Sequence, residues 1–211
     1  MQQNIIMFDF DNTIVTSLKY WYKLQYKQIF KLFNMKPVKN FDKLEKGFTS
    51  DDYVDFLKKF IKHATRKQLY NTLYKTMEHH YLHDIKLIKG AKEYLYKLKK
   101  ERKILVLASA TWTKLLKTAL VHFEIDIFDK VYSEPDLTYS KKQPEFFNIV
   151  LKDLNCKAED IYFYEDSVSS LKTATSLGIE CCAVKHSLNK KKLHTVEQQC
   201  DTVIKNFKKL I

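Results

Sequence analysis

Two aspartates that follow the first apolar run of the chain are the residues best suited to do chemistry. Asp9 and Asp11 come directly after the run at 5–8, whose continuous apolar character predicts a strand buried on both faces. Ligand sites of parallel α/β sheets lie beyond the carboxyl ends of the strands. Carboxylates at that place can attack, move a proton or bind a hard cation. The plainer interpretation is that they cap the following loop or helix.

Further polar groups stand at corresponding places later in the chain. They are Ser109, Ala110 and Thr111 after the apolar run at 104–108, Lys141 in the loop before Pro144, and Glu165 and Asp166 after the run at 161–164. Taken singly, these groups can be a helix cap, a surface lysine and a solvated loop. Their common setting at successive strand ends instead favours one site that combines carboxylates, a hydroxyl, backbone amides and a cation.

The residues between the first two strands have helical spacing. Thr65-Arg66-Lys67-Gln68 is a capping box that predicts the start of a helix. An apolar stripe on that helix consists of Leu69, Leu73 and Met77. An earlier stripe predicts one helix that carries Leu18, Trp21, Tyr22, Ile29, Leu32 and Phe33. We therefore expect residues 16–88 to form a small helical unit.

From residue 89 onward, strands alternate with helices. Apolar runs near 104–108, 130–133, 161–164 and 181–184 are separated by helical patterns, one opened by Pro144 and one closed by Gly178. Such alternation predicts parallel pairing through crossovers. We expect an α/β fold, with a core domain of residues 1–15 and 89–211 that residues 16–88 interrupt as a helical domain.

The composition is that of a globular protein. Of the 211 residues, 45% are hydrophobic and 29% are charged, which argues against disorder. No apolar run could cross a bilayer and no signal-type segment is present, so we expect a soluble, cytoplasmic protein. The four cysteines lack metal-type spacing and are expected to be free thiols. The net charge of +12 could favour nucleic acid, but scattered lysines are more often a solvated surface.

The order of the polar groups resembles that of the haloacid dehalogenase superfamily of phosphoryl-transfer enzymes over nearly the full chain. The first motif is matched by Asp9-Phe10-Asp11-Asn12-Thr13, the second by Ser109, the third by Lys141 and the fourth by Glu165-Asp166-Ser167. Residues 16–88 stand where members that act on small phosphorylated molecules have a helical cap. The resemblance thus implies a Rossmann-like core with an inserted cap. One departure is Lys142, where many relatives have proline, and we expect it to change loop stiffness more than chemistry.

The resemblance also implies catalytic roles. Asp9 would attack phosphorus to form an aspartyl phosphate, which water then hydrolyses. Asp11 would protonate the leaving oxygen and later deprotonate the attacking water. Ser109 and the amide of Ala110 would hold a phosphoryl oxygen, and Lys141 would offset negative charge.

A divalent cation is implied by the same resemblance and by the balance of charge. The expected ligands are Asp9, Asp166 and the main-chain carbonyl of Asp11, with Glu165 either a ligand or outside the ligand set. The site would hold four carboxylates, those of Asp9, Asp11, Glu165 and Asp166, and the single cation of Lys141. A phosphate dianion would therefore be repelled without more positive charge. Mg²⁺ is the expected cofactor because it prefers oxygen ligands and commonly binds carboxylates together with substrate phosphate.

The predicted function is a Mg²⁺-dependent phosphatase of a small phosphorylated metabolite, either a sugar phosphate or a nucleotide. A sugar phosphomutase stays open because its core motifs look alike. A dehalogenase is less favoured because dehalogenases lack the counterpart of Asp11. A non-catalytic nucleic-acid-binding protein has only the net charge in its favour, so neither nucleic acid nor a membrane is the expected partner.

Two clusters are interpreted as surface features. His79, His80 and His83 stand at the end of the inserted helices without a metal-binding pattern, which predicts a solvated helix end. The run Lys190-Lys191-Lys192 predicts an exposed turn.

Overall fold

The structure is a computed structural model that describes residues 3–23, 28–36, 38, 50–187, 189, 193–195 and 197–211. A six-stranded sheet has the order β3-β2-β1-β4-β5-β6, and each neighbouring pair is parallel. The strands are β1 (Ile5–Phe8), β2 (Ile104–Ser109), β3 (Lys130–Ser133), β4 (Ile161–Glu165), β5 (Glu180–Val184) and β6 (Thr202–Ile204). The predicted α/β fold with a parallel sheet is confirmed.

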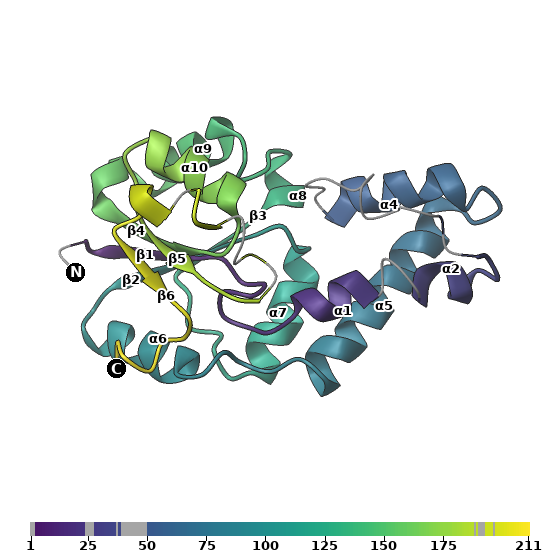
Figure 1. The fold of residues 1–211 in the computed structure, drawn as a ribbon, viewed down its shortest axis with the longest axis horizontal. Coiled ribbons are helices and arrows are strands. Elements are labelled where there is room, and N and C mark those ends of the chain that lie inside the picture. Colours follow the sequence, from purple (N-terminus) through teal and green to yellow (C-terminus); the bar gives the residue numbers. More distant parts are fainter. Residues whose placement is uncertain are drawn as a thin grey trace.

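Helices cover both faces of the sheet (Figure 1). On one face, α6 (Ala91–Lys100) and α7 (Thr113–His122) pack against Ile6 and Phe8 of β1. On the other, α9 (Pro144–Leu154) and α10 (Val168–Ser176) pack against Ile5 and Met7. Because alternate side chains of a strand point to opposite faces, a strand covered on both sides must be apolar throughout. This explains the continuous apolar run that predicted β1.

The part of the chain between β1 and α6 folds into helices that extend beyond the carboxyl ends of the strands (Figure 1). They are α1 (Leu18–Lys23), α2 (Ile29–Leu32), α4 (Ser50–Phe60) and α5 (Arg66–His83). The capping box at the start of α5 is present, since the Thr65 side chain accepts a hydrogen bond from the backbone N–H of Gln68. The predicted stripe of Leu69, Leu73 and Met77 is fully buried. A short α8 (Glu134–Leu137) follows β3.

The earlier apolar stripe is partly wrong. Leu32 is 55% exposed, whereas Ile29 and Phe30 are fully buried. In the short helix α2 these two residues take the inward positions, which leaves Leu32 on the outer side. Residues 24–27, which stand between α1 and α2 in the chain, lie outside the described part, so the expectation of one helix over this stretch stays a prediction.

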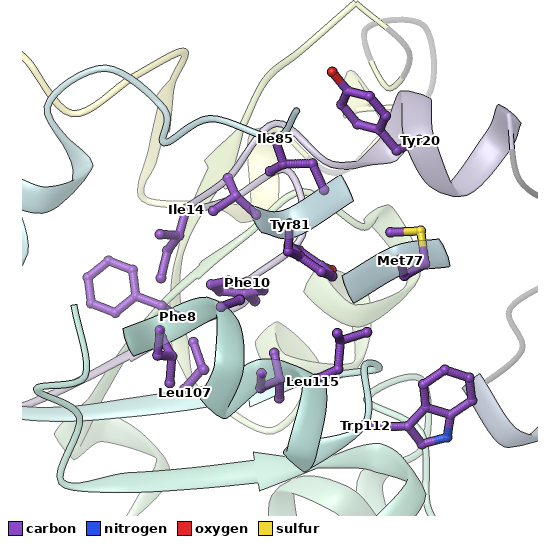
Figure 2. Packing of buried hydrophobic residues seen from close by; sticks show 14 of the residues in the cluster. Phe8, Phe10, Ile14, Tyr20, Met77, Tyr81, Ile85, Leu107, Trp112 and Leu115 are labelled. Atoms are coloured by element: carbon purple, nitrogen blue, oxygen red, sulfur yellow. The ribbon is translucent and has the colours of Figure 1, made fainter. Parts of the chain in front are cut away.

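The inserted helices share one hydrophobic cluster with the sheet. Phe8, Phe10 and Leu107 belong to the same cluster as Met77 and Tyr81 of α5, and Figure 2 shows Phe10 next to Tyr81. The Phe10 and Tyr81 ring centroids are 5.7 Å apart. Because the apolar surface is continuous, α5 is anchored directly over the loop that follows β1. The division into a core domain of 1–15 and 89–211 and a cap domain of 16–88 stays a prediction.

The histidine cluster differs from its prediction. His80 is only 8% exposed, its Nδ1 lies 2.6 Å from Asp84 Oδ2, and its ring packs against Tyr20 at 4.9 Å. A solvated helix end is therefore wrong for His80, because the turn of α5 that carries it faces α1. Within the described residues, the group of side chains arranged to hold a metal ion lies elsewhere and contains no histidine.

Three other expectations from the sequence concern the cysteines, membrane-spanning helices and the lysine run at 190–192. None of the four cysteines forms a disulfide bond, as predicted. Cys181 and Cys182 are buried, whereas Cys156 and Cys200 are partly exposed. In the described part of the chain, no helix combines the length and apolar character needed to span a membrane. The run at 190–192, expected as an exposed turn, lies outside the described residues.

Candidate active site

A tight loop at the carboxyl end of β1 places the two predicted aspartates. The N–H of Asp9 still pairs with the backbone of β4 (2.9 Å), and the N–H of Ile14 then turns back to the carbonyl of Phe10 (2.9 Å). Asn12 takes a φ of 62°, a left-handed conformation that asparagine adopts more readily than most residues. The turn therefore holds Asp9 on the strand and carries Asp11 just past its end.

Lys141 joins three strand ends through its ammonium group. Its Nζ lies 2.5 Å from Asp9 Oδ1, 2.8 Å from Glu165 Oε2 and 3.0 Å from the carbonyl of Ala108. Its backbone N–H donates to Glu134 Oε1 (3.1 Å), which fixes the loop. Lys141 is only 3% exposed, so the surface-lysine interpretation is wrong and the sequence-based placement beside Asp9 is supported.

The fourth strand end contributes Glu165 and Asp166 in different ways. Glu165 Oε1 accepts hydrogen bonds from the backbone N–H groups of Asp166 and Ser167, both at 2.9 Å. Asp166 Oδ2 lies 2.8 Å from Nε2 of His186, and its carbonyl accepts from Asn189 Nδ2 (2.9 Å). Glu165 thus braces the start of α10, while Asp166 is held from the loop after β5.

Negative charge exceeds positive charge in this buried cluster. Burial raises the pKa of Asp9 well above its usual range, and the nearby Glu165 carboxylate adds to the effect. Burial likewise raises the pKa of Asp166, again with Glu165 as the next cause. Burial alone would lower the pKa of Lys141, but the charges of Asp9 and Glu165 outweigh it, so the pKa of Lys141 is raised. One lysine cannot balance three carboxylates in a low-dielectric site.

The carboxylates fit a hard divalent cation. Among the described residues, Asp9, Glu165 and Asp166 form a group whose potential ligand oxygens all lie within 4.8 Å of one another. Asp9 Oδ2 is buried and has no hydrogen-bond partner among the residues that the structure describes, an uncommon state for a buried polar atom. An all-oxygen donor set suits Mg²⁺. The Asp11 carboxylate is not part of this group.

The loop after β2 carries the predicted hydroxyl. Ser109 is fully buried, and its Oγ accepts a hydrogen bond from the backbone N–H of Thr111 (3.1 Å). Because Oγ is the acceptor in that bond, its own hydrogen can be donated to a ligand. Ala110 lies between these two residues at the strand end. Ser109 and Ala110 thus lie at the carboxyl end of β2, the strand that pairs with β1. The sequence predicted this strand-end position.

Three donors surround the Asp11 carboxylate, and two of them, Tyr81 and Trp21, were not identified as site residues by the sequence analysis. Tyr81 Oη donates to Asp11 Oδ1 (2.5 Å), and Trp21 Nε1 lies 3.3 Å from the same oxygen. Thr111 Oγ1 donates to Asp11 Oδ2 (2.8 Å). Burial raises the pKa of Tyr81 well above its usual range, with the Asp11 charge adding to it, so the phenol keeps its proton. The one available signal was spacing, since Tyr81 continues the every-fourth-residue stripe that ends at Met77.

The chain matches known proteins in sequence. Residues 6–184 match the protein family described as haloacid dehalogenase-like hydrolase. A curated relative, a phosphorylated carbohydrates phosphatase of Thermotoga maritima, is 33% identical over 102 residues, which cover 47% of this chain and 47% of the relative. The match therefore spans about half the length of that relative.

Solved structures match over nearly the whole chain. A protein of Haemophilus somnus 129pt, described as a predicted phosphoglycolate phosphatase, has a TM-score of 0.75 at 20% identity and covers 100% of this chain and 97% of its own. A Thermotoga maritima protein described as a β-phosphoglucomutase has a TM-score of 0.73 at 21% identity, covering 96% and 94%. The hydrolase YfnB of Bacillus subtilis, bound to magnesium, has a TM-score of 0.72 at 18% identity, covering 100% and 97%. At these identities the likeness shows the fold alone.

Proposed function

The chain belongs to the haloacid dehalogenase-like hydrolase family, and from this premise we propose that it is a Mg²⁺-dependent phosphatase of a small phosphorylated metabolite. The observation that carries the proposal is the buried cluster in which Lys141 binds Asp9 and Glu165 beside Asp166. A buried group with excess negative charge costs stability, and two of its carboxylate oxygens accept no hydrogen bond from the described residues. A functional reason for the group is therefore required.

Asp9 is the proposed nucleophile. Lys141 holds its Oδ1 at 2.5 Å, while Oδ2 has no hydrogen-bond partner in the described part of the chain. As an Asp9 oxygen bonds to phosphorus, the bond between phosphorus and the leaving oxygen breaks, which gives an aspartyl phosphate. Water then attacks phosphorus and releases inorganic phosphate. Ser109 and the amide of Ala110 are proposed to bind a phosphoryl oxygen, and Lys141 to offset charge on the transferred group.

Asp11 is the proposed acid and base. It would give a proton to the leaving oxygen in the first step and take one from the attacking water in the second. Its place just past the end of β1, beside Asp9 in the same loop, supports this role. Full hydrogen bonding of both carboxylate oxygens, at 2.5 and 2.8 Å, supports it further because the group is held in one orientation.

Mg²⁺ is proposed to bind Asp9, Asp166 and the main-chain carbonyl of Asp11. Glu165 already uses Oε1 for two amides and keeps Oε2 beside Lys141, which favours a place outside the ligand set. When bound, the ion would neutralise the carboxylates and polarise the phosphoryl oxygens. The magnesium-bound neighbour of similar fold supports this choice of metal.

The substrate class is proposed from the relatives. The curated relative acts, by its name, on phosphorylated carbohydrates, so a sugar phosphate is favoured over a nucleotide. The neighbour described as a β-phosphoglucomutase keeps a sugar phosphomutase as the second candidate. We further propose that residues 16–88 act as a cap over a core of residues 1–15 and 89–211. A cytoplasmic location stays a prediction.

Release of inorganic phosphate tests the proposal directly. Purified protein would be incubated with an aryl phosphate, a panel of sugar phosphates and nucleotides, each with Mg²⁺ and with EDTA. We expect release that requires Mg²⁺, with a sugar phosphate as the best substrate. Movement of phosphate on a sugar without release would support the mutase instead. No turnover of any ester by folded protein would overturn both, and salt-sensitive binding of nucleic acid would then favour the binding-protein alternative.

A further inference from the structure

We propose that Tyr81, assisted by Trp21, is a positioning residue that orients the Asp11 carboxylate for proton transfer. The inference rests on the proposed function and deepens it, because it assigns a catalytic task to the inserted helices. Neither residue belongs to the four motifs that identify the site. Both come from the segment between β1 and β2, Trp21 from α1 and Tyr81 from α5.

One oxygen of the Asp11 carboxylate accepts hydrogen bonds from two side chains that also contact each other. Tyr81 Oη is 2.5 Å from Asp11 Oδ1, and Trp21 Nε1 is 3.3 Å from both that oxygen and Tyr81 Oη. The other oxygen, Oδ2, accepts from Thr111 Oγ1 at 2.8 Å. An aspartate side chain has two free torsions, and its outer torsion is broad when nothing holds it. Donors from the cap on one oxygen and from the core on the other fix the plane of the carboxyl group.

Tyr81 is itself held rigidly. Its side chain is fully buried, and its ring packs against Phe10, the residue between the two aspartates, at 5.7 Å. Figure 2 shows Tyr81 and Phe10 facing each other between α5 and the loop after β1. A phenol in such a position donates a hydrogen bond at a fixed point. Proton transfer depends steeply on the position of the acid, so this donor has a direct consequence for rate.

The leaving group distinguishes positioning of the acid from a general structural role. An aryl phosphate with an acidic leaving group needs little protonation, whereas a sugar phosphate leaves as a basic alkoxide and depends on the acid. Loss of acid catalysis therefore slows the sugar phosphate selectively. A loosened fold would slow both substrates in the same proportion.

The experiment compares kcat and KM of wild type, Tyr81→Phe and Trp21→Phe on p-nitrophenyl phosphate and on the best sugar phosphate. We expect Tyr81→Phe to lower kcat for the sugar phosphate about 10- to 100-fold and for the aryl phosphate less than about threefold, with KM unchanged. Trp21→Phe should give the same selectivity to a smaller degree. Tyr81→Phe should cause no further loss in an Asp11→Asn background, because both changes remove one interaction.

The matched control is Tyr74→Phe, on the same helix, whose ring packs against Tyr70 and Trp112. It should leave both substrates unchanged. Equal loss on both substrates from Tyr81→Phe and Trp21→Phe in folded protein, or full additivity with Asp11→Asn, would overturn the inference while leaving the proposed function intact. Failure of wild type to hydrolyse either substrate would instead overturn the proposed function, and the inference with it.

Discussion

Two clusters of one cation and two carboxylates occupy opposite environments in this protein. In the surface cluster, Arg66 lies 3.2 Å from Asp51 and 2.7 Å from Asp55, with side chains 52%, 39% and 59% exposed. In the site cluster, Lys141 lies 2.5 Å from Asp9 and 2.8 Å from Glu165, with side chains 4%, 7% and 1% exposed. The distances are similar, and burial is the difference.

Burial distinguishes an ion-pair cluster that contributes little to stability from one that points to a functional site. Exposed ion pairs are screened by water and contribute about 0.2–1 kcal/mol. Burial makes each charge costly unless it is paired, and the site cluster adds a third carboxylate, Asp166, which lies beside His186. Replacing such a buried charged cluster with apolar residues of similar volume is often neutral or stabilising, so stability alone does not explain why the cluster is present. Buried charged groups that lower stability are typical of catalytic and metal-binding sites.

The largest expected effect is on turnover. Asp9→Asn should lower phosphate release by about 10⁴-fold or more, because it removes the proposed nucleophile. Asp55→Asn makes the same chemical change in the surface cluster and should leave kcat unchanged. Steady-state phosphate release by both variants checks the contrast. Near-normal turnover by Asp9→Asn would remove the nucleophile assignment.

Loss of the buried cation should be the largest effect on stability. Lys141→Met leaves Asp9 and Glu165 without their common partner, so we expect the free energy of unfolding to fall by about 3–5 kcal/mol. Urea denaturation without metal measures it. A loss as small as that from Arg66→Met would mean that burial does not separate the two clusters.

Mg²⁺ should stabilise the protein in a pH-dependent way. Because burial raises the pKa of Asp9 and of Asp166, the folded metal-free protein binds more protons than the unfolded chain above the unfolded pKa. Its unfolding free energy therefore falls as pH rises toward the raised pKa values. At a fixed Mg²⁺ concentration that equals 100 times its Kd at about pH 8, Mg²⁺ should contribute about 2.7 kcal/mol there. At about pH 5 the same concentration should contribute less, because protonated carboxylates bind the ion more weakly. Equal shifts in Tm at both pH values, or an equal shift in Asp9→Asn, would contradict this.

The smallest expected effect is in the surface cluster. Arg66→Met should lower the free energy of unfolding by less than about 1 kcal/mol, and the loss should shrink further with added salt. Phosphate release should not change. A cost comparable to that of Lys141→Met, measured by the same urea titration, would show that the surface cluster is structural after all.

The sequence predicted the parts that depend on local pattern. Buried strands need continuous apolar runs, so β1, β2 and β4 were visible, and the strand-end motifs followed from them. Lys141 was found through its place in a motif, although nothing local distinguishes it from the many exposed lysines. Tyr81, Trp21 and His186 could not be assigned because their roles arise from tertiary contacts: Tyr81 and Asp11 are far apart in the chain. Leu32 and His80 were misplaced for the same reason, since helical spacing does not say which neighbour covers a face.

Trapping the covalent intermediate tests the role of Asp9 as nucleophile most directly. Protein turning over its best substrate with Mg²⁺ would be quenched in acid, digested and analysed by mass spectrometry for a phosphoryl group. We predict an acyl phosphate, cleaved by hydroxylamine, on the peptide that contains Asp9, and its absence in Asp9→Asn. A phosphoryl group on any other residue, with Asp9→Asn still active, would contradict the assignment of Asp9 as nucleophile.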